Sequence, residues 1–99
     1  MEIVWTREAE ESYTETVEDI LNKWTIKELA VFADKTEDII ALILKNNEIG
    51  KLYKKTAFRQ FLITEQTYLF YKLVNNKVYL ILFWNNRKNP LKLDSVLTP

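Results

Sequence analysis

The chain has 99 residues, of which 47% are hydrophobic and 28% charged, and its formal net charge is zero. That length supports one domain with a single modest core, and that composition is ordinary for a folded protein. The sequence has no cysteine and no histidine, which excludes disulfides, the usual Cys/His zinc sites and catalytic systems that need either side chain. We therefore predict a single domain, residues 1–99, with no metal or cofactor.

The two halves of the chain carry opposite charge. Residues 1–50 contain 5 basic and 12 acidic side chains, a balance of −7, whereas residues 51–99 contain 9 basic and 2 acidic side chains, a balance of +7. Nine of the 13 aromatic residues also lie beyond residue 50. A basic and aromatic half can simply fill the core of a sheet, or it can bind nucleic acid or an acidic partner.

The first half is predicted to form a strand and two helices. Residues 3–5 are expected to be a short strand, and residues 7–23 have apolar side chains at helical spacing behind a suitable N-cap, Thr6. A capping box at residues 25–28 begins a second helix, which ends near residues 46–50. The two helices have almost no linker, so we expect a hairpin. Because the second helix is nearly apolar all round near its end, we expect it between the first helix and a sheet.

The second half is predicted to form strands. Residues 57–64, 67–74 and 78–84 are rich in aromatic and branched side chains, and the asparagines at 75–76 suit a two-residue hairpin turn. The tail at 91–97 alternates enough to be a short edge strand or an ordered arm. The predicted fold class is α+β, in the order β-α-α-β-β-β, with a helical hairpin packed on one face of an antiparallel sheet.

Both faces of the predicted sheet are apolar, although a helical hairpin can cover one. Strict alternation along residues 78–84 places Tyr79 and Phe83 on one face, and Leu80 and Trp84 on the other. Part of the uncovered face must therefore be covered by the tail, by a second copy of the chain, or by a partner.

The start of the chain lacks the basic and apolar regions of a signal peptide. The longest apolar runs, residues 39–44 and 78–84, are too short to span a membrane. We therefore expect a soluble cytoplasmic protein.

Several short motifs follow one another in a fixed order. A strand ending in Trp5-Thr6 is followed by two helices and by the segments NEIG (47–50), FRQFLI (58–63), LFYK (69–72) and FWNNRKNP (83–90). This order resembles that of the RelE/ParE superfamily, and the last segment is similar to the Trp-His-x-Arg-x-Asn-Pro signature of ParE-like members. The resemblance covers about residues 3–93. It implies a RelE-like fold, the toxin of a type II toxin–antitoxin pair as found in plasmid stabilisation, and a small antitoxin protein as partner.

That family contains two activities. RelE-like members cleave mRNA on the ribosome without a metal, using basic residues on the central strands and an aromatic residue or histidine near the C-terminus. ParE-like members act on DNA gyrase and lack that set. In this chain, residues 61–64 replace the lysines, residues 68–69 replace the arginine, and Leu93 lies near the position of the terminal tyrosine. The signature histidine is an asparagine, at 85 or 86, and Arg87 is the one basic residue that matches.

The resemblance thus implies a ParE-like gyrase inhibitor with no catalytic residues. A ribosome-dependent mRNA endoribonuclease and a non-toxic binding module of the same fold are the alternatives. The candidate contacts with the target or with phosphate are basic residues: Arg87, Lys88, Lys54, Lys55 and Arg59. Each basic residue also has a plain structural interpretation, which for Arg59 is a contact with a helix carboxylate.

An antitoxin of this family wraps its toxin with an extended acidic segment, which can add along the sheet edge or cross its open face. Such a segment needs apolar anchors on the toxin as well as cations. The candidate antitoxin-binding residues are accordingly aromatic residues of the last two predicted strands: Tyr68, Phe70, Tyr79, Phe83 and Trp84.

Overall fold

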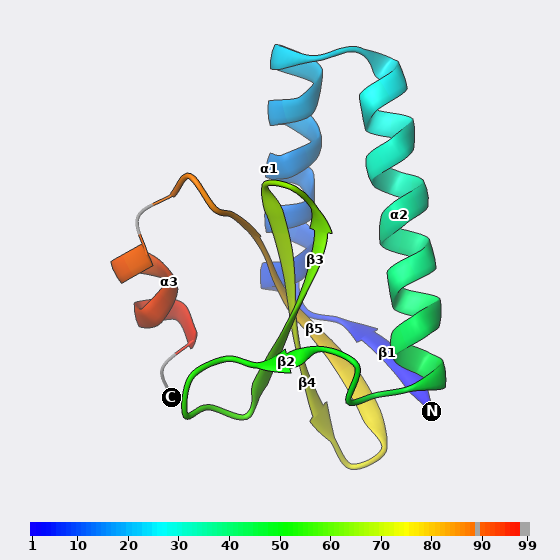
Figure 1. The fold of residues 1–99 in the computed structure, drawn as a ribbon, viewed down its shortest axis with the longest axis vertical. Helices are drawn as coiled ribbons and strands as arrows, with labels where there is room; N and C mark the ends of the chain where they lie inside the picture. The colour runs from blue at the N-terminus through cyan, green and yellow to red at the C-terminus, as the bar shows by residue number, and fades with distance from the viewer. Residues whose placement is uncertain (89, 98–99) are drawn as a thin grey trace.

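The computed structural model describes residues 1–88 and 90–97. Its elements are β1 (Glu2–Trp5), α1 (Arg7–Lys23), α2 (Ile26–Lys45), β2 (Lys51–Leu52), β3 (Phe58–Thr64), β4 (Thr67–Val74), β5 (Lys77–Asn85) and α3 (Pro90–Leu97). The predicted α+β order is confirmed, and the short strand β2 and the helix α3 are additions to it (Figure 1). Within the described part of the chain, none of the helices has the length and hydropathy needed to cross a membrane.

A single five-stranded sheet has the order β1-β5-β4-β3-β2. The pair β1 and β5 is parallel, and the other neighbouring strands are antiparallel. The β4–β5 turn is formed as predicted by Asn75 and Asn76, whose φ angles of 48° and 66° suit a short polar side chain. Because β1 pairs with β5, it brings Thr6 next to the end of the sheet, where the Thr6 hydroxyl donates to the Leu80 carbonyl at 2.7 Å.

The helices α1 and α2 lie side by side on one face of the sheet, α1 mainly on β5 and α2 on β3 (Figure 1). Both predicted starts are confirmed: the Thr6 hydroxyl caps α1, and the Thr25 backbone N–H donates to Glu28 at 2.9 Å in the capping box of α2. The expected position of α2 between α1 and the sheet is wrong. Because α1 packs beside α2 and not above it, Leu42 and Leu44 of α2 remain exposed.

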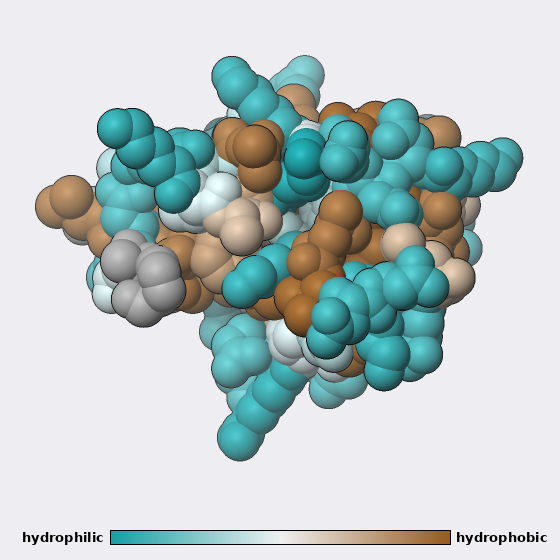
Figure 2. Space-filling view, turned by 90° about the horizontal axis from the view of Figure 1, so that it is seen from below, coloured by the Kyte–Doolittle hydropathy of each residue, from teal (hydrophilic) through white to brown (hydrophobic). Residues whose placement is uncertain are grey.

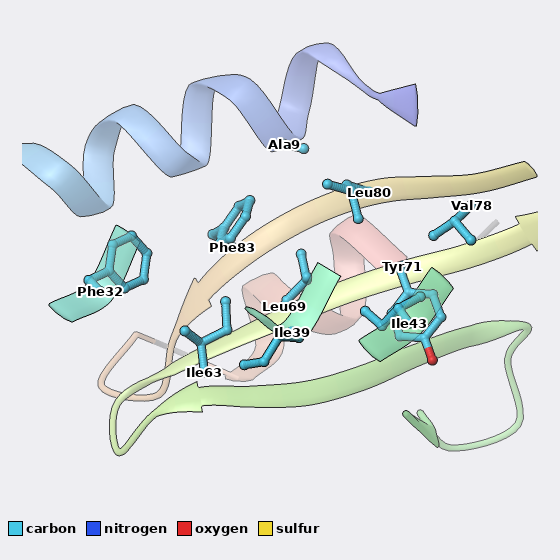
Figure 3. Close-up of a cluster of buried hydrophobic side chains, with 10 residues drawn as sticks. All are labelled: Ala9, Phe32, Ile39, Ile43, Ile63, Leu69, Tyr71, Val78, Leu80 and Phe83. Atoms are coloured by element: carbon cyan, nitrogen blue, oxygen red, sulfur yellow. The ribbon is translucent and has the colours of Figure 1, made fainter. Parts of the chain in front are cut away.

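The alternation predicted along β5 is also wrong beyond Leu80. The register between β4 and β5 shifts at this point and leaves Ile81 as an extra residue, which forms a β-bulge. After the bulge, Phe83 packs on the helical side of the sheet, as Figure 3 shows, whereas Leu82 and Trp84 pack on the opposite side. One inserted residue has therefore exchanged the faces of the last three core positions.

The core on the helical side contains an aromatic group around Phe83. Its ring centroid lies 5.6 Å from that of Trp5, 5.1 Å from that of Tyr13 and 6.4 Å from that of Phe32. Its backbone N–H donates to the hydroxyl of Ser12 at 2.9 Å, which fixes α1 against β5. The same core is completed by smaller and aliphatic residues and one tyrosine: Ala9, Ile39, Ile43, Ile63, Leu69, Tyr71, Val78 and Leu80 (Figure 3).

The opposite side of the sheet, called here the second face, is covered in part by α3. Leu93 and Leu97 of this helix are four residues apart and pack with Phe70, Leu82 and Trp84. Of the two forms predicted for 91–97, the edge strand is wrong and the ordered arm is present as a helix, because two leucines at helical spacing are buried together on the second face. The tail, a second copy of the chain and a partner were proposed as covers for this face, and the structure shows the tail in that place.

Candidate functional site

The candidate site is the second face with the two segments that border it, α3 and the loop between β2 and β3. Its floor is apolar, because Phe70, Leu82 and Trp84 are buried there. A polar cluster joins α3 to the loop at the border. Any acid–base or ionic chemistry at the site therefore depends on the polar groups of this border.

The border cluster consists of Tyr53, Lys54 and Asp94, and is called here the α3 latch. The Asp94 carboxylate accepts hydrogen bonds from the Tyr53 hydroxyl and from the Lys54 ammonium group, the latter at 2.7 and 2.8 Å. The Lys54 nitrogen also lies 5.2 Å from the centroid of the Tyr53 ring. The latch ties Asp94 to residues that are 40 and 41 positions earlier in the sequence.

Each group of the α3 latch is stabilised in its ordinary charge state. The hydrogen bond from Lys54 lowers the pKa of Asp94, and the same bond raises the pKa of Lys54. Burial, followed by the hydrogen bond to Asp94, raises the pKa of Tyr53. All three pKa values move away from neutrality, so the latch is suited to holding α3 and not to transferring protons.

A mixed row of side chains lies on the second face across three strands. Phe58 of β3 pairs with Lys72 of β4, and Lys72 pairs with Tyr79 of β5. The Lys72 nitrogen is 5.4 Å from the centroid of the Phe58 ring, within the range of a cation–π contact. All three side chains are half-buried, so this part of the face offers aromatic surface and positive charge to a partner.

The five basic candidates lie in three different places. Lys54 belongs to the α3 latch, and Lys55 is exposed on the same loop. Arg59 points to the helical side, where its guanidinium donates to the carbonyl oxygens of Glu48 at 3.1 Å and Gly50 at 2.8 Å. The structural role expected for Arg59 is therefore present, but its partners are backbone carbonyls and not a helix carboxylate.

Arg87 and Lys88 lie in the third of these places, directly after the end of β5. Arg87 is exposed. The Lys88 nitrogen lies 3.4 Å from the Glu15 carboxylate of α1 and 5.7 Å from the centroid of the Trp84 ring. This pair therefore borders α1, and the structure does not gather the basic candidates into one cluster.

The aromatic candidates are divided by the bulge in β5. Phe83 is 2% exposed beneath the helices, so its predicted place on the open face is corrected. Phe70 and Trp84 belong to the second face but are buried there with the leucines of α3. Tyr68 and Tyr79 are half-buried on that face, which leaves part of each ring accessible.

Tyr53 and Asp94 were not among the residues predicted for the site. A signal was present in the tail, where Pro90 suits the first position of a helix and Leu93 and Leu97 are spaced by one turn. A helix at 90–97 would have placed Asp94 beside the buried leucines. Its contact with Tyr53, however, depends on tertiary structure.

The comparisons with known proteins are informative about the fold. No protein-family model matches the sequence, and neither does any curated protein. Among solved structures, a YoeB/ParE toxin from Agrobacterium tumefaciens is similar, with a TM-score of 0.62 over 86% of this chain and 98% of that chain. The chain has a RelE/ParE-like toxin fold. The two sequences are 15% identical, so this likeness establishes the fold, and the activity must be inferred from the site.

Proposed function

We propose that this protein is the toxin of a type II toxin–antitoxin pair, that it inhibits DNA gyrase as ParE-like toxins do, and that a cognate antitoxin neutralises it. It would act in the bacterial cytoplasm. The likeness to a YoeB/ParE toxin supports the toxin class. The choice of gyrase over mRNA rests on the chemistry of the second face.

The observation that carries this choice is the apolar floor of the second face, beneath α3. Metal-independent cleavage of RNA requires groups that transfer protons and donors that stabilise phosphate charge. The floor of the second face is made of Phe70, Leu82 and Trp84, and α3 adds Leu93 and Leu97 to it. The polar groups of the α3 latch are bound to one another, and the ammonium group of Lys72 on the same face lies against the Phe58 ring. This arrangement favours an inhibitor that binds its target over a nuclease.

The antitoxin is proposed to bind the accessible part of the second face. There, Tyr68 and Tyr79 offer partly exposed rings, and Lys72 and Lys55 can meet acidic residues. Phe83 is not a contact, because it is buried on the helical side. Phe70 and Trp84 become contacts if α3 moves away from the sheet.

One observation keeps the nuclease as the second candidate. Arg87, the residue that matches the basic pattern of the RelE-like nucleases, is exposed at the end of β5. An exposed guanidinium can bind phosphate. If the protein is a nuclease, Arg87 is the side chain whose replacement by alanine should abolish cleavage.

Growth after induction tests the toxin class. Cells that express the chain alone should stop growing, and co-expression of the gene adjacent to it should restore growth. Primer extension on ribosome-bound message from the same cells should show no new cleavage. Normal growth with verified soluble protein would reject a toxin, and cleavage at ribosomal A-site codons that Arg87→Ala abolishes would replace gyrase by mRNA.

A further inference from the structure

The row of Phe58, Lys72 and Tyr79 on the second face, called here the mixed row, lies at the end of the sheet next to the β4–β5 turn. Its members come from three neighbouring strands, so Phe58 and Tyr79 are two strand spacings, or about 10 Å, apart. Lys72 stands between them, with its nitrogen 5.4 Å from the centroid of the Phe58 ring. Figure 2 views this end of the molecule, where hydrophobic patches and hydrophilic side chains lie side by side. The mixed row thus offers two half-buried rings with a cation between them.

This end of the second face carries an excess of positive charge. By strand register, or by position on the β2–β3 loop and α3, five lysines and two carboxylates belong to it: Lys51, Lys54, Lys55, Lys72, Lys77, Glu2 and Asp94. Asp94 is bound by Lys54, and Glu2 is the register partner of Lys77. The other three lysines form no ion pair among residues 1–88 and 90–97. Their uncompensated charge favours an anionic ligand.

The groups that the mixed row presents indicate which kind of anion fits it. A peptide that adds to a sheet binds through backbone hydrogen bonds at a sheet edge. At Lys72, however, β4 is paired with β3 on one side and with β5 on the other, so only side chains are available to a ligand. Aromatic rings stack on the bases of a nucleic acid strand, and lysines bind its phosphates. The mixed row therefore suits a nucleic acid better than an acidic peptide.

We propose that the mixed row binds a single strand of DNA without cutting it. A base stacks on the Tyr79 ring, and neighbouring phosphates bind the ammonium groups of Lys51, Lys55 and Lys72. The row itself contains neither a carboxylate nor a histidine to act as a general base. The choice of DNA over RNA rests on the proposed function, because gyrase acts on DNA. An antitoxin that covers the same face displaces the strand.

Fluorescence anisotropy of a labelled oligothymidylate of about 12 nucleotides, titrated with the full chain, tests the proposal. The strand should bind. The logarithm of its binding constant should fall against the logarithm of the salt concentration with a slope of about −2, as expected for three phosphate contacts to a single strand. A duplex of the same length, whose bases are stacked on one another, should bind at least about fivefold more weakly.

Two pairs of variants locate the site. Lys72→Glu should weaken binding by about tenfold or more, whereas Lys35→Glu, with the same net charge but on α2, should change it by less than about twofold. Tyr79→Ala should weaken binding by about fivefold or more, and Tyr79→Phe by less than about twofold, because the ring is the group that stacks. Circular dichroism verifies that each variant is folded, and Lys55→Glu, on an exposed loop, gives a milder second test in the same direction as Lys72→Glu.

Several results would overturn the proposal: no binding at low salt, tighter binding of the duplex, no effect of Tyr79→Ala, or equal weakening by Lys72→Glu and Lys35→Glu. Tighter binding of an oligouridylate would make RNA the ligand, and its cleavage by the same protein would also count against gyrase. Binding of an acidic peptide but not of the DNA strand would identify a peptide as the occupant. Because the assay contains no gyrase, it can fail while supercoiling is still inhibited, so failure of this inference and failure of the proposed function are distinguishable.

Discussion

Replacing Phe83 by alanine should destabilise the protein severely. The ring is 2% exposed and contacts the rings of Trp5, Tyr13 and Phe32, with centroids 5.1 to 6.4 Å away. Truncation of such a buried phenylalanine to alanine costs about 3–5 kcal/mol of unfolding free energy. A domain of this length has a total of about 5–15 kcal/mol, so the change removes a large fraction of the stability.

Urea titration and thermal melting measure this loss. The melting temperature should fall by more than about 12 °C, since each kcal/mol corresponds to about 4–8 °C in a domain of this size. Two controls bracket the effect: Phe83→Leu keeps most of the volume and should cost roughly 1–2 kcal/mol, and Tyr79→Ala removes a half-buried ring from the second face. If Phe83→Ala cost less than about 1 kcal/mol, or no more than Tyr79→Ala, the bulge and the face assigned to Phe83 would be wrong.

Three further changes test other contacts. Gly50→Ala should lower stability by about 1–3 kcal/mol in urea titration, because a Cβ there would lie 2.7 Å from the Tyr71 ring and hydroxyl; an unchanged midpoint would contradict that close packing. The pKa of Asp94 is lowered in the folded protein, so its stabilisation of α3 is complete above the unfolded pKa and is lost as the pH falls through the folded pKa. The protection factors of the α3 amides, which are exchange rates corrected for the intrinsic effect of pH, should therefore fall in acid, and Asp94→Asn should remove that pH dependence. Lys88→Ala should change the free energy of unfolding, measured by thermal melting, by less than about 1 kcal/mol, because the ion pair of Lys88 with Glu15 is exposed. A larger loss would mean that this ion pair stabilises the fold.

The sequence predicted those elements whose signals are local. The capping residues Thr6 and Thr25 fixed the starts of both long helices, and the asparagines at 75–76 indicated the β4–β5 turn. Caps and short turns are formed by contacts between neighbouring residues, so the rest of the fold changes them little. The likeness to a YoeB/ParE toxin agrees with the fold expected from the ordered motifs.

The features that the sequence did not predict depend on distant contacts. Strict alternation put Phe83 on the wrong face, because the bulge at Ile81 is a property of the pairing of β5 with β4 and has no signal in β5 alone. The basic candidates were chosen by residue type alone, and the structure places Arg59 on the helical side of the sheet and Arg87 beyond the end of β5. A strand position specifies a face only after the register is known.

The central claim is that the protein binds and inhibits DNA gyrase, and a supercoiling assay with purified components tests it most directly. Relaxed plasmid, gyrase and ATP are incubated with the purified chain, with and without the product of the adjacent gene. We predict that the chain alone prevents supercoiling and that the adjacent gene product restores it. Undiminished supercoiling at an excess of folded protein, together with cleavage of ribosome-bound mRNA by the same preparation, would contradict the proposed function.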